Sequence, residues 1–400
     1  IGVVSVHVNQ TGFSRTTSMT PTIDNGVNFI ATLTNPFPNG FLQPTKASGG
    51  LSTNLGAGVS FYDQAIKNPY MERWQFAVQR GLPGNAVLEV SYVGNRGVRQ
   101  RLSRNYTALP NQYLSTLPTR DQPTIDFLSA AVPNPFYPLL PGTNLSGTTV
   151  SRAQLLQPYP HFTGVSRDQN QGYSWYHSMQ VRLEKRFASG LSTSVAYTWS
   201  KLMDATGFLN AGDPLPEEVI SASDRTQRLV VTWIYALPLG RGKRWAGSIP
   251  VLSTLIGGWQ LQGVYQGQSG PPLGFGDAIF TGDLKNVPLP GDQRTVDRWF
   301  NVDAGFERSS AKALASHLRS FSSRFGGIRG DGINQFDLSV LKNTRLKEGV
   351  NLELRAEANN ALNHAQFTIP NTTPSSTAFG RVTSEFSMPR TTQIALKLVF

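Results

Sequence analysis

The sequence has no cysteine, and charged residues make up only 15% of its 400 residues. Without cysteine, a disulfide framework, a zinc-thiolate site and a cysteine nucleophile are all excluded. The charged fraction is well below the roughly one quarter that is usual for soluble domains. Because 39% of the residues are hydrophobic, the chain can still bury a sizeable core, and a disordered chain is excluded.

Long hydrophobic runs are missing too. The longest nearly apolar run, at 229–239, is about half the length of a membrane-spanning helix and close to the ~9–11 residues of a spanning β-strand. The opening residues, IGVVSVHVNQ, lack the basic region and the cleavage-like site of a signal peptide. We interpret Ile1 as an internal position of a longer protein.

The net charge of +11 would suit a nucleic-acid partner. However, the lysines and arginines are spread along the chain, and the densest cluster is only Arg241, Lys243 and Arg244. A solvated turn accounts for a cluster this short. We therefore predict no nucleic-acid partner.

Motifs for metals and cofactors are also absent. The five histidines have no ligand spacing, and LPLGRGKRW lacks the first glycine and the final serine or threonine of a phosphate loop. Arg329-Gly330-Asp331 can serve as an adhesion ligand, but we favour a return from a loop into a strand. In the segment 309–321, Leu314, Leu318 and Phe321 have the spacing of a short helix, which we interpret as loop packing. We predict no metal and no cofactor.

What the sequence does have is alternation. Apolar and polar residues alternate in segments that have about the length of a membrane β-strand. Stretches rich in glycine and proline separate these segments. Ten strands are expected, at 3–8, 73–79, 88–93, 178–187, 191–200, 229–237, 259–268, 336–340, 350–359 and 393–400. The last of them ends at Phe400, and an apolar edge of this kind is an aggregation hazard in water.

The connections alternate between short and long. Short turns at one end of the strands and long loops at the other are typical of an outer-membrane barrel, with the turns in the periplasm. We predict an all-β, antiparallel transmembrane β-barrel in the outer membrane of a Gram-negative bacterium. Its aromatic side chains would form two interfacial girdles. The girdle residues are Trp74, Tyr92, Phe187, Tyr197, Trp199, Tyr235, Trp259 and Tyr265.

The polar faces of the strands carry charges of both signs, which would line the lumen. They could form a polar path for a solute, a surface against which a plug domain packs, or an ion-pair lattice that only solvates the wall. Catalysis is not expected, because the carboxylates of ELRAEA flank an arginine that neutralises them. The lumen-facing candidates are Arg73, Glu89, Arg182, Glu184, Glu353, Arg355 and Glu357.

Eight phrases, in order along nearly the whole chain, resemble the C-terminal barrel half of Oar-like TonB-dependent outer-membrane receptors. They are NPYMERWQFAVQRGL, LEVSYVGNRG, YHSMQVRLEKRFASGLSTSVAYTWSKLMD, YALPLGRGKRW, GGWQLQGVYQGQSGPPL, FDLSVLKNTRL, LRAEANNALNHAQF and MPRTTQIALKLVF. The resemblance implies that residues 1–400 are the last ten strands of a barrel of about 22 strands that encloses a plug. The plug and the TonB box would precede this chain.

The resemblance also implies partners and a mechanism. Force delivered through the TonB complex would displace the plug and admit a large solute, which the loops 98–172 and 271–331 would meet. For Oar-like members the resemblance also implies a surface role in adhesion or export. The barrel-assembly machinery would recognise the terminal strand, and the lipid bilayer would surround the wall. The expected assembly signal is Ile394, Leu396, Leu398 and Phe400. A passive porin, an outer-membrane adhesin and, more remotely, a soluble carbohydrate-binding β-protein remain alternatives.

Overall fold

The computed structural model of the chain describes residues 22, 28–41, 43, 49–63, 67–240, 243, 245 and 256–400. In these residues an eleven-stranded sheet dominates, and nine of its strands follow the order β15-β14-β13-β10-β9-β7-β6-β3-β2. They are β2 (Tyr70–Leu82), β3 (Ala86–Asn105), β6 (Gly164–Ala188), β7 (Leu191–Ala205), β9 (Gln227–Ala236), β10 (Trp259–Gln268), β13 (Ile333–Lys347), β14 (Val350–Asn359) and β15 (Thr391–Val399).

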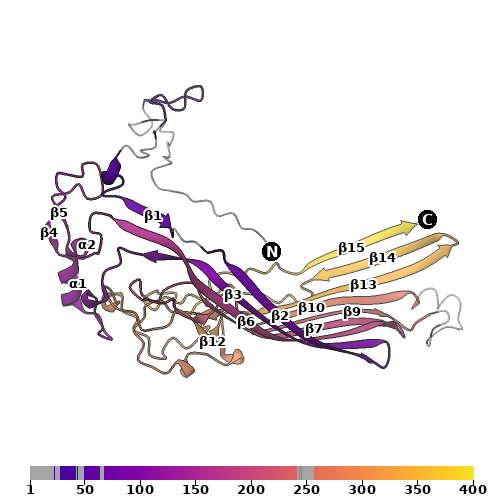
Figure 1. Cartoon of the computed structure of the whole chain (residues 1–400). Helices are drawn as coiled ribbons and strands as arrows, with labels where there is room; N and C mark the ends of the chain where they lie inside the picture. The colour runs from indigo at the N-terminus through magenta and orange to yellow at the C-terminus, as the bar shows by residue number, and fades with distance from the viewer. Residues whose placement is uncertain are drawn as a thin grey trace.

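Nine of the ten expected strands are therefore confirmed. All eight pairs along the path are antiparallel, and each strand pairs with the next of the nine in sequence. The remaining expected strand, at 3–8, lies outside the described residues. The chain thus forms a meander in which each strand follows its predecessor through the sheet (Figure 1).

The pairing keeps all apolar stripes on one face. Because side chains alternate along a strand, directly paired residues share a face. One such row contains Val78, Val90, Val181, Tyr197 and Leu229, in that order across five strands. The next row along each strand lies on the opposite face and contains Gln79, Glu89 and Arg182. The sheet therefore has one apolar wall and one polar wall.

Tight turns fix this register. Between β6 and β7, Ser189 and Gly190 have φ angles of 52° and 83°, and Ala188 pairs with Leu191. Positive φ at both central residues is the requirement of a type I′ turn, which matches the twist of a hairpin. A slip by one residue would move every apolar side chain to the polar wall.

Two strands are much longer than expected. β3 has 20 residues and β6 has 25, and they remain paired out to Asn105 and Ser166. Consequently, the predicted loop 98–172 is wrong at both ends, and the connection runs only from 106 to 163. Bulges between Gly97 and Gln100 and between Gln100 and Leu102 break the alternation there, so the polar sequence did not show a strand period.

The long connections gather at one end of the sheet and carry smaller elements (Figure 1). Strand β1 (Gly58–Tyr62) pairs in parallel with β6, and β8 (Val219–Ile220) pairs with β7. Two small sheets and two short helices complete the set. These are β4 (Ala131–Pro133) with β5 (Thr149–Ser151), β11 (Pro272–Leu273) with β12 (Phe325–Arg329), α1 (Gln122–Ser129) and α2 (Arg152–Leu155). In the described part of the chain, no helix is long and apolar enough to span a membrane.

The main buried cluster lies in these connections and not in the sheet. We call it the loop core; it joins the connection between β10 and β13 with the connection between β14 and β15. Its buried members are Leu273, Phe275, Val287, Trp299, Phe300, Phe306, Ile328 and Phe379. Phe321 packs against it, while 309–321 contains only a 3-10 turn at Ser310–Lys312. The interpretation of this segment as loop packing is therefore confirmed.

Both outer strands of the sheet are open. Every residue of β2 and every residue of β15 is exposed, and neither strand has a second partner in the described part of the chain. Two free edges leave rows of backbone N–H and C=O groups without partners. Each of these edges can therefore accept a further strand.

Glycines on the apolar wall leave room for tryptophan rings. Trp233 pairs with Gly263, and a Cβ atom at Gly263 would lie 2.0 Å from Trp233 Cζ2. Gly263→Ala should force the indole away and lower the free energy of unfolding by about 1–3 kcal/mol. The measurement is the temperature at which the heat-modifiable band shifts on a gel. Gly81→Ala is the control, since a Cβ there meets nothing within 4 Å, and equal shifts would contradict the prediction.

Candidate functional site

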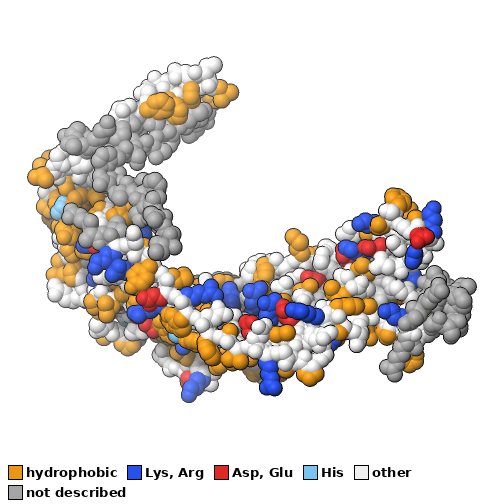
Figure 2. Space-filling view, turned by 45° about the vertical axis from the view of Figure 1, so that its right-hand side comes forward, with side chains coloured by type: hydrophobic (Ala, Val, Ile, Leu, Met, Phe, Trp, Pro, Cys, Tyr) orange, Lys and Arg blue, Asp and Glu red, His pale blue; other side chains and the backbone are white. Residues whose placement is uncertain are grey.

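The polar wall and the loops above it form the candidate site. Figure 2 shows an arc-shaped molecule that is hollowed on one side, with acidic and basic side chains in a band along the sheet. The predicted lumen-facing residues fall into two groups. Glu89 pairs directly with Arg182, two residues from Glu184, whereas Glu353, Arg355 and Glu357 all lie on β14. Arg73 pairs with Asn95, away from both groups.

Ion pairs join neighbouring positions within strands. Arg182 pairs with Glu184 on β6. On β14, Arg355 lies 3.0 Å from Glu353 and 3.5 Å from Glu357. These charges are half-buried or exposed, so the pairs contribute little to stability. The described residues show no ion pair at Arg73 or Glu89, which leaves those side chains available to another molecule.

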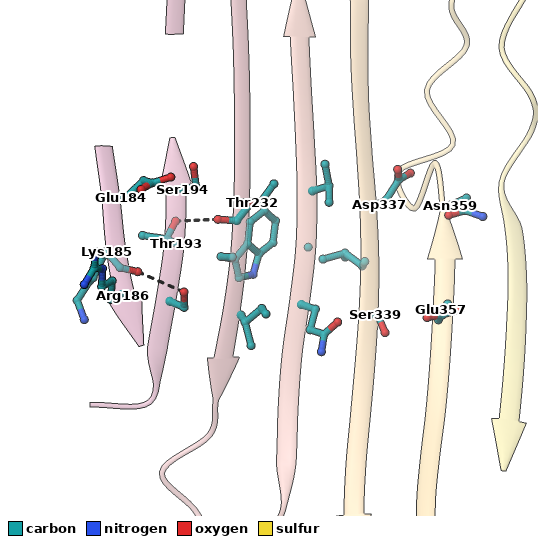
Figure 3. Close-up of a pocket in the computed structure, with 17 residues that line it drawn as sticks. Glu184, Lys185, Arg186, Thr193, Ser194, Thr232, Asp337, Ser339, Glu357 and Asn359 are labelled. Carbon is teal, nitrogen blue, oxygen red and sulfur yellow. Dashed lines mark hydrogen bonds between the residues drawn. The ribbon is translucent and has the colours of Figure 1, made fainter. Parts of the chain in front are cut away.

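A hollow of about 610 Å³ lies between the two groups (Figure 3). Hydroxyl, amide and carboxylate groups from six strands line much of it. Glu184, Ser194, Thr232, Gln262, Asp337, Ser339 and Glu357 are among the lining residues. The Ser339 hydroxyl is buried and has no hydrogen-bond partner. Trp233, Ile234, Val264 and Leu338 also line the hollow, so it offers both directional hydrogen bonds and apolar contact to a solute or a packed domain.

Sequence reasoning missed several members of this hollow. Asp337 is the clearest case: its carboxylate accepts hydrogen bonds from Gln335 Nε2 at 3.1 Å and from the Asn360 backbone N–H at 2.8 Å. The sequence did contain one signal for Asp337: it lies on the polar face of the expected strand at 336–340, two residues after Gln335. The hydroxyl residues gave no signal, because serine and threonine are common on any strand.

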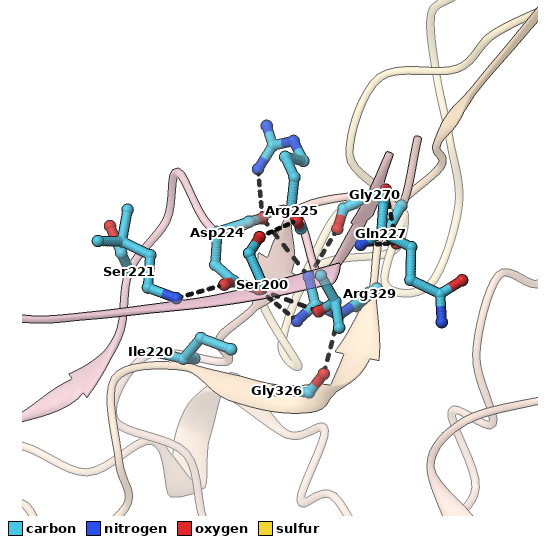
Figure 4. Close-up of polar contacts among 12 residues, drawn as sticks. Ser200, Ile220, Ser221, Asp224, Arg225, Gln227, Gly270, Gly326 and Arg329 are labelled. Atoms are coloured by element: carbon cyan, nitrogen blue, oxygen red, sulfur yellow. Dashed lines mark hydrogen bonds and ion pairs between the residues drawn. The ribbon is translucent and has the colours of Figure 1, made fainter. Parts of the chain in front are cut away.

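The loops are anchored to the sheet by a buried ion pair (Figure 4). Arg329, at the end of β12, donates from Nη2 to Asp224 Oδ2 at 2.6 Å, and the Asp224 side chain is 0% exposed. Asp224 also accepts from the Leu202 backbone N–H at 2.7 Å, and Arg329 Nη1 donates to the Gly270 carbonyl at 2.9 Å. One contact network therefore ties β7, β12 and the ends of two long connections together.

This network also explains Arg329-Gly330-Asp331. Arg329 is engaged by Asp224, and Asp331 accepts hydrogen bonds from the backbone N–H groups of Gly332 and Phe367. The segment lies between the last residue of β12 and the first of β13, as the loop-to-strand interpretation expected. Because both charged side chains hold the fold together, an adhesion role has no support here.

Seven of the eight predicted girdle residues lie on the apolar wall, and Phe187 lies in the bulge between Lys185 and Ala188, where the pairing assigns it no face. Trp74 and Trp199 are 42% and 55% exposed and lie in the loop-side halves of their strands, whereas Tyr92, 41% exposed, is nearer the turn end of β3. Phe187 and Tyr235 lie beside the turn ends. Tyr197 lies near the middle of β7, Tyr265 lies in the loop-side half of β10, and Trp259 is the first residue of β10, at its turn end. Assignment of these rings to membrane interfaces stays a prediction, as does recognition of the exposed terminal residues Ile394, Leu396, Leu398 and Phe400.

A carboxylate also holds two loops together. Glu217 Oε1 accepts from Ser322 Oγ at 2.7 Å and from the Ser323 backbone N–H at 3.1 Å. Burial tends to raise the pKa of Glu217, but the hydrogen bonds outweigh it and lower the pKa below the ordinary value of 4.5. The ionised side chain is therefore the form that joins the loops.

The low pKa of Glu217 predicts a pH dependence. A group whose pKa is lower in the folded state stabilises the fold above its ordinary pKa and loses this effect as the pH falls through the lower value. We expect the protection factor of the Ser323 amide in hydrogen exchange to be constant from pH 7 to about 5 and to decline below pH 4.5. Glu217→Gln should remove the decline and Glu218→Gln should keep it; an unchanged decline in Glu217→Gln would contradict the assignment.

In the described ranges, no group of three or more histidine, aspartate or glutamate side chains is arranged to hold a metal ion. Most of the basic cluster at 241–244 lies outside those ranges. The site as described therefore consists of hydrogen-bonding groups and charges of both signs.

Comparisons with known proteins agree with this geometry. A sequence profile described as the outer membrane beta barrel domain matches residues 3–393. A comparison with curated proteins gives no match. The chain belongs to the outer membrane beta barrel domain family, and its place is the outer membrane of a Gram-negative bacterium.

Solved structures with a similar arrangement are distant in sequence. The outer membrane transporter YddB from Escherichia coli is 9% identical, with a TM-score of 0.42 over 86% of this chain and 34% of that one. The FrpB iron transporter from Neisseria meningitidis is 10% identical, with a TM-score of 0.36 over 85% and 32%. The siderophore receptor PiuA from Acinetobacter baumannii is 9% identical, with a TM-score of 0.33 over 82% and 28%. The chain thus spans about a third of these structures.

Proposed function

We propose that this chain is a section of an Oar-like, TonB-dependent outer-membrane receptor that takes up a large, unidentified solute. The polar wall carries the proposal: an apolar face is matched by a face on which carboxylate, guanidinium, hydroxyl and amide groups surround a hollow of about 610 Å³. In a closed barrel that face lines the lumen. Residues 1–400 would supply the C-terminal strands, with the plug and the TonB box contributed by sequence outside this chain.

The mechanism would be gating. The plug would pack against the polar wall, where Arg73 and Glu89 can exchange hydrogen bonds with it. Polar contacts of this kind can be broken and remade at modest cost, so force from the TonB complex could displace the plug. The folded connections 106–163 and 269–332 would meet the solute first. The ion-paired carboxylates of β14 leave no free acid and base, and we propose no catalytic activity.

Conductance through the full-length protein tests this proposal. In a planar bilayer, the intact protein should hold no steady open state, and deletion of the plug-coding segment should give a large, stable conductance. A steady conductance of the intact protein would favour the passive porin, and the absence of conductance from both forms would favour the adhesin. Recovery of the protein in the soluble fraction would overturn the barrel itself.

A further inference from the structure

The apolar wall changes character toward the loops. On β2, β3, β6 and β7, one row of paired residues consists of Phe76, Tyr92, Met179 and Trp199. The next row on the same face consists of Trp74, Gly94, His177 and Lys201, and the one beyond it of Glu72, Arg96, Trp175 and Met203. The first row has no charged side chain, whereas the next two contain Lys201, Glu72 and Arg96 beside aromatic rings.

The rings in these rows are held in place by one another. The Tyr92 hydroxyl lies 2.5 Å from His177 Nδ1, and the centroid of His177 lies 5.3 Å from that of Trp175. Lys201 Nζ lies 5.9 Å from the centre of the Trp175 ring. The cation therefore stands over a fixed aromatic surface, which is a favourable position near a membrane interface.

A cavity of about 550 Å³ lies beside this surface. Its lining is mostly apolar, and the residues that supply it from the apolar wall are Tyr92, His177, Met179, Trp199 and Lys201. Ile220 and Gly326 border it from the loop side. Trp199 and Met179 are 55% and 40% exposed, so the cavity is continuous with the lipid-facing wall and has room for an acyl chain.

Two cations of this surface are available to a ligand: Lys201 lines the cavity, and Arg96 lies outside it, paired in register with Trp175. Arg96 and Lys201 are exposed, and neither forms an ion pair within the described part of the chain. Two carboxylates are near: Glu72 is paired in register with Arg96, and Glu218 is engaged by Tyr173 Oη at 2.8 Å and Trp175 Nε1 at 3.3 Å. Lys201 at the apolar cavity and Arg96 on β3, two strands away, match an anionic headgroup joined to acyl chains.

We propose that this surface binds one phosphorylated, acylated glycolipid of the outer leaflet, of the lipid A type. Arg96 and Lys201 contact its phosphate groups, and an acyl chain enters the cavity against Met179 and Trp199. The long loops place this end of the strands on the extracellular side, where such lipids are found. The inference rests on the outer-membrane location and is independent of the transport proposal.

Native mass spectrometry of the full-length protein in detergent tests the site, with bis-phosphorylated lipid A as the probe. The unaltered protein should retain one lipid A. Arg96→Gln with Lys201→Gln should weaken binding about 25-fold, because each cation near the surface contributes about a factor of five. Arg80→Gln with Arg228→Gln removes the same charge from other parts of the same sheet and should leave binding unchanged.

Two further arms keep the test independent of folding. Arg96→Lys with Lys201→Arg should bind as the unaltered protein does, and lipid A without phosphate should bind the unaltered protein about as weakly as the double glutamine variant. Equal binding of lipid A with and without phosphate would overturn the proposal. Equal binding of phosphatidylglycerol would also overturn it, since the site would then be a general anionic-lipid surface.

Discussion

Replacing Arg329 with methionine should destabilise the loops by about 3–5 kcal/mol, because it leaves the fully buried carboxylate of Asp224 without its counter-charge. The loss should be local. The nine-stranded meander has its own pairing, while the ion pair ties β12 and the connection at Gly270 to the sheet. Hydrogen exchange of amides in the segment 269–332 would measure this loss as faster local opening.

An exposed ion pair in the same region is the matched control. Arg381 lies 2.8 Å from Asp297, with side chains that are 55% and 69% exposed. Arg381→Met should cost less than about 1 kcal/mol. Arg329→Lys should fall between the two, because an ammonium keeps the charge but loses the planar fork of donors. Equal effects of Arg329→Met and Arg381→Met would show that burial of Asp224 has no energetic consequence.

Phe300→Ala should have an effect of similar size, about 3–5 kcal/mol, by opening a cavity in the loop core. Phe300 is 1% exposed, and its ring centroid lies 5.3 Å from that of Phe275 and 5.1 Å from that of Phe379. Phe275 and Phe300 belong to the connection between β10 and β13, and Phe379 belongs to the connection between β14 and β15, so the cavity would loosen both connections. The measurement is the rate at which a protease cleaves the loops of the detergent-solubilised protein.

A conservative change and an exposed residue control for this variant. Phe300→Leu keeps most of the volume and should cost less than about 1.5 kcal/mol. Phe386→Ala alters a ring that is 55% exposed and should change cleavage little. If Phe300→Ala and Phe386→Ala were cleaved at the same rate, the aromatic cluster would not be what holds the loops together.

The wall of the sheet could be predicted from the sequence because one face meets hydrocarbon throughout. That constraint makes every second residue apolar along each strand, as at Val181 on β6, Tyr197 on β7 and Leu229 on β9. Turn residues such as Ser189 and Gly190 then fix which strands pair. The period of two is lost where strands pass beyond the apolar stripe. Bulges interrupt β3 between Gly97 and Leu102, and after Val98 the strand pairs with β6 alone among the described residues.

The loops could not be predicted, since their contacts join residues that are remote in sequence. Asp224 and Arg329 are separated by 105 positions, and neither stands in a pattern that distinguishes it from a solvated charge. The same holds for Phe300 and Phe379, whose spacing follows no helix or strand period. For the polar wall, the sequence supplied residues such as Arg182 and Glu357, but not the hollow between them, because that depends on the order of strands.

The loop core and the apolar wall respond to different surroundings. The loop core is stabilised by the hydrophobic effect in water, so salts and osmolytes that are excluded from protein surfaces increase its stability. The wall, from Val78 to Leu398, faces hydrocarbon and responds instead to the thickness of the bilayer. The medium outside the cell and the composition of the membrane can therefore alter one part of this chain without altering the other.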